Sequence, residues 1–318
     1  SYQWQYAPIG SGTFTDIATA TNATYTAPAA KVGQHRAKVL SDGGCEVFSN
    51  AATLSSPGHF VVQYTLPAGQ NSLFFKALTN GVVNYTYTTS AGNSGSGSFS
   101  QATPLGLPAF ANGALTLPLN NTSVLNEVVT LAIEGTNLKQ FQTVGASSIY
   151  FTDVLQWGTT AWTSVDNMFY NSSKLTTISA TDKPDLSIAS SMRSMFRNCS
   201  TLVSVPNMNS WNTSNIQIMD SVFVGCKFFN QSLSAWNLSN VTSTIGMFAQ
   251  AAKFNNGGDP GINDWDVSKL TSVGFMFSQD STFNQPVGKW NMGNVIGLRA
   301  MFNAATNFNQ DISNWDVR

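Results

Sequence analysis

The chain has 318 residues, enough for roughly two or three domains, and its formal net charge is −1. Hydrophobic residues make up 42% and can build ordinary cores, whereas charged residues make up only 10%, against about 25% in a typical soluble domain. A nearly neutral chain without a basic stripe argues against nucleic acid or an anionic membrane surface as a partner. No apolar run approaches the about 20 residues of a membrane-spanning helix, so we expect no membrane span.

Residues 1–56 are predicted to form short strands separated by glycine-rich turns. The candidate strands are residues 2–6, 23–26, 35–39 and 46–48. The run Tyr-Gln-Trp-Gln at 2–5 resembles strand C of immunoglobulin-like domains in Bacteroidetes secreted proteins, where a buried tryptophan anchors the core. The resemblance implies a partial immunoglobulin-like domain whose first strands are missing. We therefore expect the parent protein to extend upstream.

Residues 57–150 alternate apolar and polar side chains in several runs. Residues 60–66, 82–88, 115–117 and 128–134 are candidate strands, since alternation is typical of a half-buried strand. Residues 90–98 are rich in glycine and serine and are predicted to be a loop.

From about residue 151 the sequence repeats itself. The landmarks share one register, with tryptophans 25, 29, 25 and 25 residues apart, and an insertion at 256–261 accounts for the single longer step. The repeated positions are Trp211, Trp236, Trp265, Trp290 and Trp315; the pairs at 168–169, 195–196, 222–223, 247–248, 276–277 and 301–302; and the Phe-Asn pairs at 229–230, 254–255, 283–284 and 308–309. Self-similarity at this period predicts stacked structural repeats.

Within a repeat, Ile262-x-x-Trp265-x-Val267 matches the core of leucine-rich repeats and predicts a short strand with its tryptophan facing inward. Apolar residues at 273, 276 and 277 have the spacing of a short helix. The asparagine after each repeated Phe is expected to form an internal ladder, bonding the backbone of its own turn and the next and so satisfying polar groups that would otherwise be buried unpaired. The expected fold class is mostly β with short helices: a leucine-rich-repeat-like α/β solenoid of about six coils at 151–318. The chain stops mid-repeat at Arg318, so we expect the solenoid to be truncated.

The runs Phe308-Asn-Gln-Asp-Ile-Ser-Asn-Trp-Asp-Val and Trp265-Asp-Val-Ser-Lys-Leu-Thr resemble the BspA-type leucine-rich repeats of bacterial surface proteins, which are common in the Bacteroidetes and in mycoplasmas. The resemblance covers about residues 154–318. In such proteins a β-rich domain lies just upstream, so the resemblance implies a β-sandwich at 57–150 that caps the solenoid. The family is linked to adhesion and cell-surface recognition, which implies an extracellular location at the cell surface.

One polar column is the candidate binding site. It consists of the residues that directly follow the repeated tryptophans: Asn212, Asn237, Asp266, Asn291 and Asp316. Strand alternation points these side chains outward on the concave face that solenoids use for binding. Neutral polar groups beside aromatic rings suit glycans, and the Asp members are suited to hold calcium weakly. Solvation of an exposed strand is the alternative explanation of the same column.

The sequence offers little for catalysis. The only histidines, His35 and His59, are far in sequence from any cluster of acidic residues, and no phosphate-binding, nucleophile-elbow or zinc-protease motif is present. A pair of catalytic carboxylates remains a third hypothesis. Cys199 and Cys226 are expected to be small buried residues, too far apart for a disulfide. We predict no enzyme and no cofactor.

The leading functional hypothesis is an adhesin module whose partner is a host or environmental glycan or a surface protein. Its rival is a structural spacer or filament subunit, whose partners are copies of itself. Exposed aromatic groups would favour recognition, whereas apolar patches confined to the ends would favour end-to-end assembly.

Overall fold

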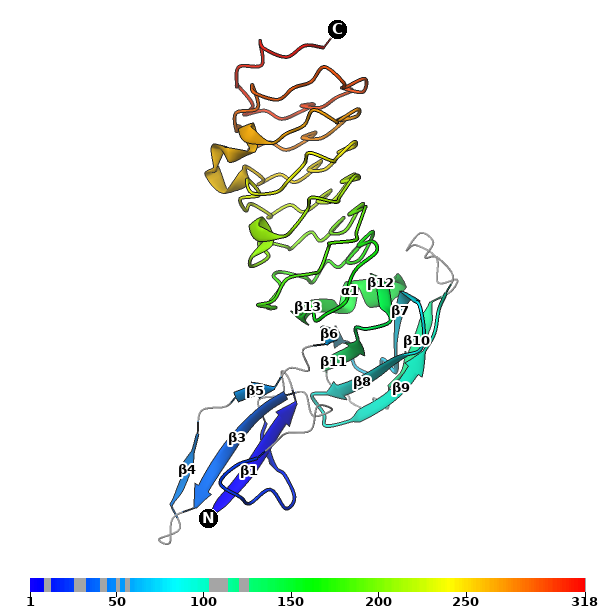
Figure 1. Cartoon of the computed structure of the whole chain (residues 1–318), viewed down its shortest axis with the longest axis vertical. Helices are drawn as coiled ribbons and strands as arrows, with labels where there is room; N and C mark the ends of the chain where they lie inside the picture. The colour runs from blue at the N-terminus through cyan, green and yellow to red at the C-terminus, as the bar shows by residue number, and fades with distance from the viewer. Residues whose placement is uncertain are drawn as a thin grey trace.

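The computed structural model describes residues 1–8, 13–25, 33–40, 45–49, 52–54, 58–102, 114–119 and 126–317. These residues form a small sheet at the N-terminus, then two sheets packed together, then a long column of stacked turns. The column carries the C-terminus to the far end of the molecule (Figure 1). We call residues 157–317 the turn stack.

The first sheet has the strand order β2-β1-β3-β4, with β5 also paired to β3. Its strands are β1 (Tyr2–Pro8), β2 (Thr15–Asp16), β3 (Gly33–Leu40), β4 (Glu46–Phe48) and β5 (Ala52–Leu54). Of the predicted strands, the one at 23–26 is wrong: residues 23–25 are not in a strand, and residue 26 lies outside the described residues. Trp4 is half-buried, with its indole N–H donating to the Asn22 carbonyl at 3.0 Å, so it is not the buried anchor that the resemblance implied.

Two further sheets share one core. The larger has the order β13-β6-β11-β8-β9 and the smaller β10-β7-β12. Their strands are β6 (His59–Leu66), β7 (Ser72–Thr79), β8 (Val83–Thr89), β9 (Ser94–Phe99), β10 (Leu115–Pro118), β11 (Glu127–Glu134), β12 (Leu138–Thr143) and β13 (Phe151–Gln156). Phe60 of β6 meets Phe141 of β12 edge to face at 5.2 Å, which joins the two sheets.

Strand β9 replaces the loop predicted at 90–98. Its glycines lie opposite the tyrosines of β8, with Gly95 paired to Tyr87 and Gly97 paired to Tyr85. A Cβ atom on Gly95 would lie 2.5 Å from the Tyr87 ring, and one on Gly97 would lie 2.6 Å from the Tyr85 hydroxyl. The tyrosine rings therefore cover the glycines, and cross-strand packing of this kind compensates for a strand without side chains.

The packed sheets continue directly into the turn stack. A short helix, α1 (Gly145–Tyr150), leads into β13, which pairs with β6. The Phe151 ring lies 5.0 Å from that of Phe169, and Trp157 lies 6.0 Å from the same ring. The Thr143 amide donates to the Met168 carbonyl at 3.0 Å. One hydrophobic core thus runs from the sheets into the first coils.

The expected leucine-rich-repeat-like α/β solenoid is wrong. The described part of the chain is β-rich through its sheets, but residues 157–317 contain neither a β-strand nor an α-helix. Neighbouring coils are joined by isolated parallel bridges, such as Ser243 to Ser272 and Ser272 to Gly297. The helical segments of the stack are three short 3-10 helices, η1 (Met208–Ser210), η2 (Asn256–Gly258) and η3 (Pro260–Asp264), the last two in and beside the insertion.

The coils turn without helices because two residues in each coil have left-handed backbone angles. One precedes the buried pair, as Phe275 does (φ 60°), and one follows it, as Gln279 does (φ 60°). The Met276 amide donates to the Val273 carbonyl of its own coil at 3.1 Å, whereas the Phe275 amide donates to Arg299 of the next coil at 2.8 Å. Amides that alternate between two coils cannot form the continuous i to i−4 bonds of an α-helix.

Aromatic rings stack along the inside of the turn stack. The first ring of each coil stacks on the next, with centroids 5.6 Å apart for Phe248 and Phe277 and again for Phe277 and Phe302. The Trp290 indole N–H donates to the Ile262 carbonyl of the preceding coil at 2.8 Å. The predicted inward position is confirmed for Trp211, Trp236, Trp265 and Trp290, which are buried, whereas Trp315 is half-buried.

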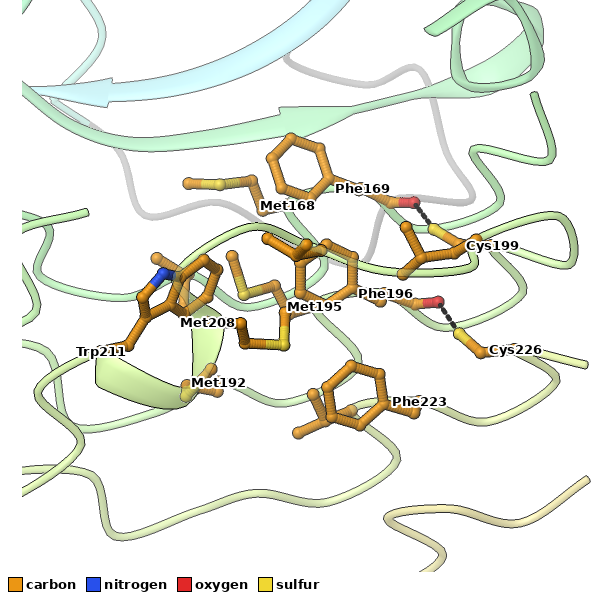
Figure 2. Packing of buried hydrophobic residues seen from close by; sticks show 14 of the residues in the cluster. Met168, Phe169, Met192, Met195, Phe196, Cys199, Met208, Trp211, Phe223 and Cys226 are labelled. Carbon is orange, nitrogen blue, oxygen red and sulfur yellow. Dashed lines mark hydrogen bonds between the residues drawn. The ribbon is translucent and has the colours of Figure 1, made fainter. Parts of the chain in front are cut away.

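The prediction for the two cysteines is also confirmed. Both are buried free thiols, and each donates a hydrogen bond to the preceding coil: Cys199 Sγ to the Phe169 carbonyl at 3.1 Å and Cys226 Sγ to the Phe196 carbonyl at 3.0 Å (Figure 2). Burial raises the pKa of both thiols.

The asparagines after the repeated Phe residues form a ladder that joins each coil to the next, but the ladder is not internal and the bonds that follow do not go to the residues' own turns. Asn230 Oδ1 accepts from the Asn255 amide, Asn255 Oδ1 from the Asn284 amide and Asn284 Oδ1 from the Asn309 amide, each at 2.9 Å. These side chains lie at the surface of the stack. The ladder therefore ties successive turns together along one edge of the stack.

Candidate functional site

The five residues of the predicted column, Asn212, Asn237, Asp266, Asn291 and Asp316, are all exposed. None of them lies on a strand, and the first four sit in the tight turn that follows a repeated tryptophan. That turn begins where the tryptophan ring is held in the core by its indole hydrogen bond, as for Trp265 and Leu233 at 3.2 Å. The column is thus a feature of the turn surface.

At four of these positions the side-chain oxygen closes the turn. It accepts a hydrogen bond from the amide two residues later: Asn212 from Ser214 (3.2 Å), Asn237 from Ser239 (2.9 Å), Asp266 from Ser268 (3.0 Å) and Asn291 from Gly293 (3.2 Å). Asn and Asp favour this geometry in turns. Hydrogen bonds from the Ser268 side chain and amide lower the pKa of Asp266. The turns therefore give the column a shared structural role beyond solvation.

A groove of about 660 Å³ contains the last two members of the column, Asn291 and Asp316. Most of its lining is polar, with four amide side chains, two carboxylates and one ammonium group. The lining residues are Asn263, Pro286, Gly288, Lys289, Trp290, Asn291, Met292, Gln310, Asp311, Asn314 and Asp316. Such a mixture offers donors and acceptors to a neutral polar ligand.

The two coils that border the groove approach closely at Gly288. A Cβ atom at this position would lie 2.6 Å from the Asp311 carbonyl oxygen. The Lys289 ammonium group forms an exposed ion pair with Asp264 at 2.7 Å. Hydrogen bonds from the Ser313 amide and side chain lower the pKa of Asp311, which keeps this carboxylate charged. The groove is thus polar and, with its lysine paired, weakly acidic.

The described residues contain no group of three or more His, Cys, Asp or Glu side chains that could hold a metal ion. The weak calcium site expected at the Asp members of the column stays a prediction. In the described parts of the chain, no helix has both the length and the apolar character needed to cross a bilayer.

Of the five residues in the predicted column, Asn291 and Asp316 line this groove, whereas Asn212, Asn237 and Asp266 lie elsewhere along the stack. The other lining residues were not predicted from the sequence. A signal was available two residues before each tryptophan, where the coils carry Asn209, Ser234, Asn263, Gly288 and Ser313. Two members of this column, Asn263 and Gly288, line the groove, and Gly288 departs from the others by having no side chain.

Comparison with known proteins finds a similarity to a protein family of unknown function. A family model described as "Mycoplasma protein of unknown function, DUF285" matches residues 135–205 and 259–318, which is less than half of the chain. The matched segments contain the end of the packed sheets, the first coils and the last coils. No curated protein and no solved structure matches the chain.

Proposed function

We propose that this chain is an extracellular binding module of a bacterial surface protein, an adhesin related to the BspA-type repeat proteins. The observation that carries the proposal is the polar groove beside Asn291 and Asp316. Its amide groups suit the hydroxyl groups of a glycan or the backbone of a protein ligand, and its volume of about 660 Å³ suits a short oligosaccharide or a peptide segment. The proposal includes no catalytic step.

The test is binding of the full chain to a glycan and surface-protein array, with and without calcium. The variant Asn291→Ala with Asn314→Ala removes two amides from the groove. Asn212→Ala with Asn237→Ala is the matched control, because these residues occupy the same column outside the groove. The proposal expects saturable binding that the first variant loses and the control keeps.

An array without any saturable signal from a folded sample would contradict the proposal. Equal loss of binding in both variants would also contradict it, since that outcome would indicate a general effect of the broken turns. Loss of binding on removing calcium would show that the interaction depends on the ion.

A further inference from the structure

The residue that precedes each repeated pair, which is Met-Phe in five coils and Val-Phe at 222–223, is left-handed. Across the stack this position is occupied by Asn167, Ser194, Ser221, Gly246, Phe275 and Ala300, with φ between 52° and 62°. Small or polar residues tolerate this conformation, but a bulky side chain is a genuine outlier there. Phe275 is thus held in a strained conformation, and strain of this kind concentrates at functional sites.

Phe275 lies in a partly exposed apolar patch. Phe275 is 38% exposed and Ile245 is 40% exposed. Backbone hydrogen bonds place them and Arg299 on successive coils: the Gly246 amide donates to the Gly274 carbonyl, and the Phe275 amide donates to the Arg299 carbonyl, both at 2.8 Å. We call Ile245, Phe275 and Arg299 the Phe275 patch.

Arg299 gives the patch a positive charge. Its guanidinium carbon lies 5.6 Å from the centre of the Phe275 ring. Arg299 is exposed, and none of the ion pairs among the described residues includes it. An exposed aromatic ring beside an arginine without a carboxylate partner is suited to a ligand that has an apolar face and a negative charge.

In coils nearer the N-terminus, the positions equivalent to Arg299 carry the charged side chains of Asp166, Arg193 and Asp220, and each of these has a partner. Arg193 forms an ion pair with Asp220 at 3.2 Å. The Asp166 carboxylate accepts from the Arg193 amide at 2.7 Å, and that of Asp220 accepts from the Ile245 amide at 3.0 Å. Only the C-terminal half of this side of the stack combines an exposed ring with an unpaired arginine in the described part of the chain.

We propose that the Phe275 patch binds a carboxylated saccharide. The C–H face of a uronic acid ring stacks on Phe275 and contacts Ile245, while the carboxylate on the same ring accepts hydrogen bonds from Arg299. A sugar acid carries its apolar face and its charge on one rigid unit, as the patch does. An acidic amino-acid side chain has a flexible charge and little apolar area, which fits the patch less well. The patch shares no residue with the polar groove, so either proposal can fail without the other.

The experiment is calorimetric titration of the full chain with oligogalacturonate and with the same oligomer fully methyl-esterified, which differs only by lacking the free carboxylates. Binding to the acid form is expected, weakened by salt. Arg299→Gln is expected to reduce its affinity by about tenfold or more, the effect of losing one hydrogen bond to a charged group. Phe275→Gly is expected to lose binding while keeping the fold, because Gly246 has the same backbone conformation one coil earlier. Arg193→Gln, in the same column, is the control and is expected to bind as the parent does.

Four results would overturn the proposal. The first is no saturable binding of the acid form to the folded parent. The second is binding that neither Arg299→Gln nor Phe275→Gly changes, or that Arg193→Gln reduces equally. The third is equal affinity for the esterified oligomer, which would show that the carboxylate is not recognised. The fourth is competition by poly-glutamate at equal or better affinity, which would assign the patch to an acidic protein. The unfolding temperatures of the variants show in each case that the stack is intact.

Discussion

Asp280 is a buried acid in a position built for a small residue. It lies three residues after the repeated Phe277, where other coils carry Ser172, Cys199, Cys226, Ala251 and Ala305. Asp280 is fully buried, and neither of its carboxyl oxygens forms a hydrogen bond of normal geometry. Burial raises its pKa to about 8, although the nearby Thr282 and Phe283 amides partly offset the rise. The folded protein therefore holds this group protonated at neutral pH.

The raised pKa makes stability depend on pH in a defined direction. The unfolded chain has the ordinary pKa of 3.8, so below that pH the acid is neutral in both states and carries no penalty. As the pH rises from 3.8 towards about 8, the unfolded state ionises first and the folded state loses stability by about 1.4 kcal/mol per pH unit. At pH 7 the accumulated penalty is on the order of 4 kcal/mol.

Asp280→Ala should remove this penalty, because Ala251 and Ala305 fill the equivalent position in the adjacent coils. Urea unfolding monitored by tryptophan fluorescence at pH 4, 6 and 8 measures the free energy of unfolding. The free energies of unfolding of variant and parent should differ little at pH 4, and the variant should be several kcal/mol more stable at pH 8. The packing lost with the side chain should reduce this gain by about 1 kcal/mol. Asp280→Asn should flatten the pH dependence equally but be less stable than Ala. Parallel pH profiles for parent and variant would refute the reasoning.

Three further changes test other parts of the structure. Gly288→Ala places a methyl group 2.6 Å from the Asp311 carbonyl oxygen and should lower stability by about 1–3 kcal/mol in thermal unfolding, whereas no loss would mean that the coils separate freely there. Asn237→Ala removes the hydrogen bond to the Ser239 amide and should cost about 1 kcal/mol, while Asn237→Asp should keep stability; equal losses would argue against the turn role. Iodoacetamide at pH 8 should label exposed Cys45 but not buried Cys199 or Cys226 in the native protein, and mass spectrometry that finds all three labelled without denaturant would contradict their burial.

The sequence predicted which side chains of each coil face inward but not how its backbone runs. Val273, Met276 and Phe277 are all buried, as their spacing indicated. The same spacing fits a helix or a series of turns, because either brings these side chains to one face. The deciding feature is the left-handed conformation beside the pair, at positions where Asn171, Asn198 and Gly225 occur in other coils. Asn and Gly favour that conformation, so comparison of whole columns carried the missing signal.

The candidate site was less predictable. The column after the tryptophans was visible as a pattern, and its turns follow from the local chemistry of Asn and Asp. The groove and the Phe275 patch depend on departures from the repeat, namely Gly288 without a side chain and Phe275 in a strained position. A consensus sequence of the repeat does not contain such departures, so it could not predict either feature. The glycines of β9 show the same limit, because the tyrosine that lies against Gly95, Tyr87, is on a neighbouring strand.

The alternation of backbone hydrogen bonds has a mechanical consequence. Bonds such as that from the Phe248 amide to the Met276 carbonyl run along the axis of the stack, from one coil to the next. A force that pulls the two ends of the chain apart loads these bonds one coil at a time, so the last coil peels away while the rest hold. Each release frees about 25 residues, or roughly 85 Å of extended chain. Pulling on a single molecule should therefore give a staircase of small, evenly spaced extensions instead of one abrupt rupture. Such a protein would dissipate shear at a surface gradually and recover coil by coil when the tension falls.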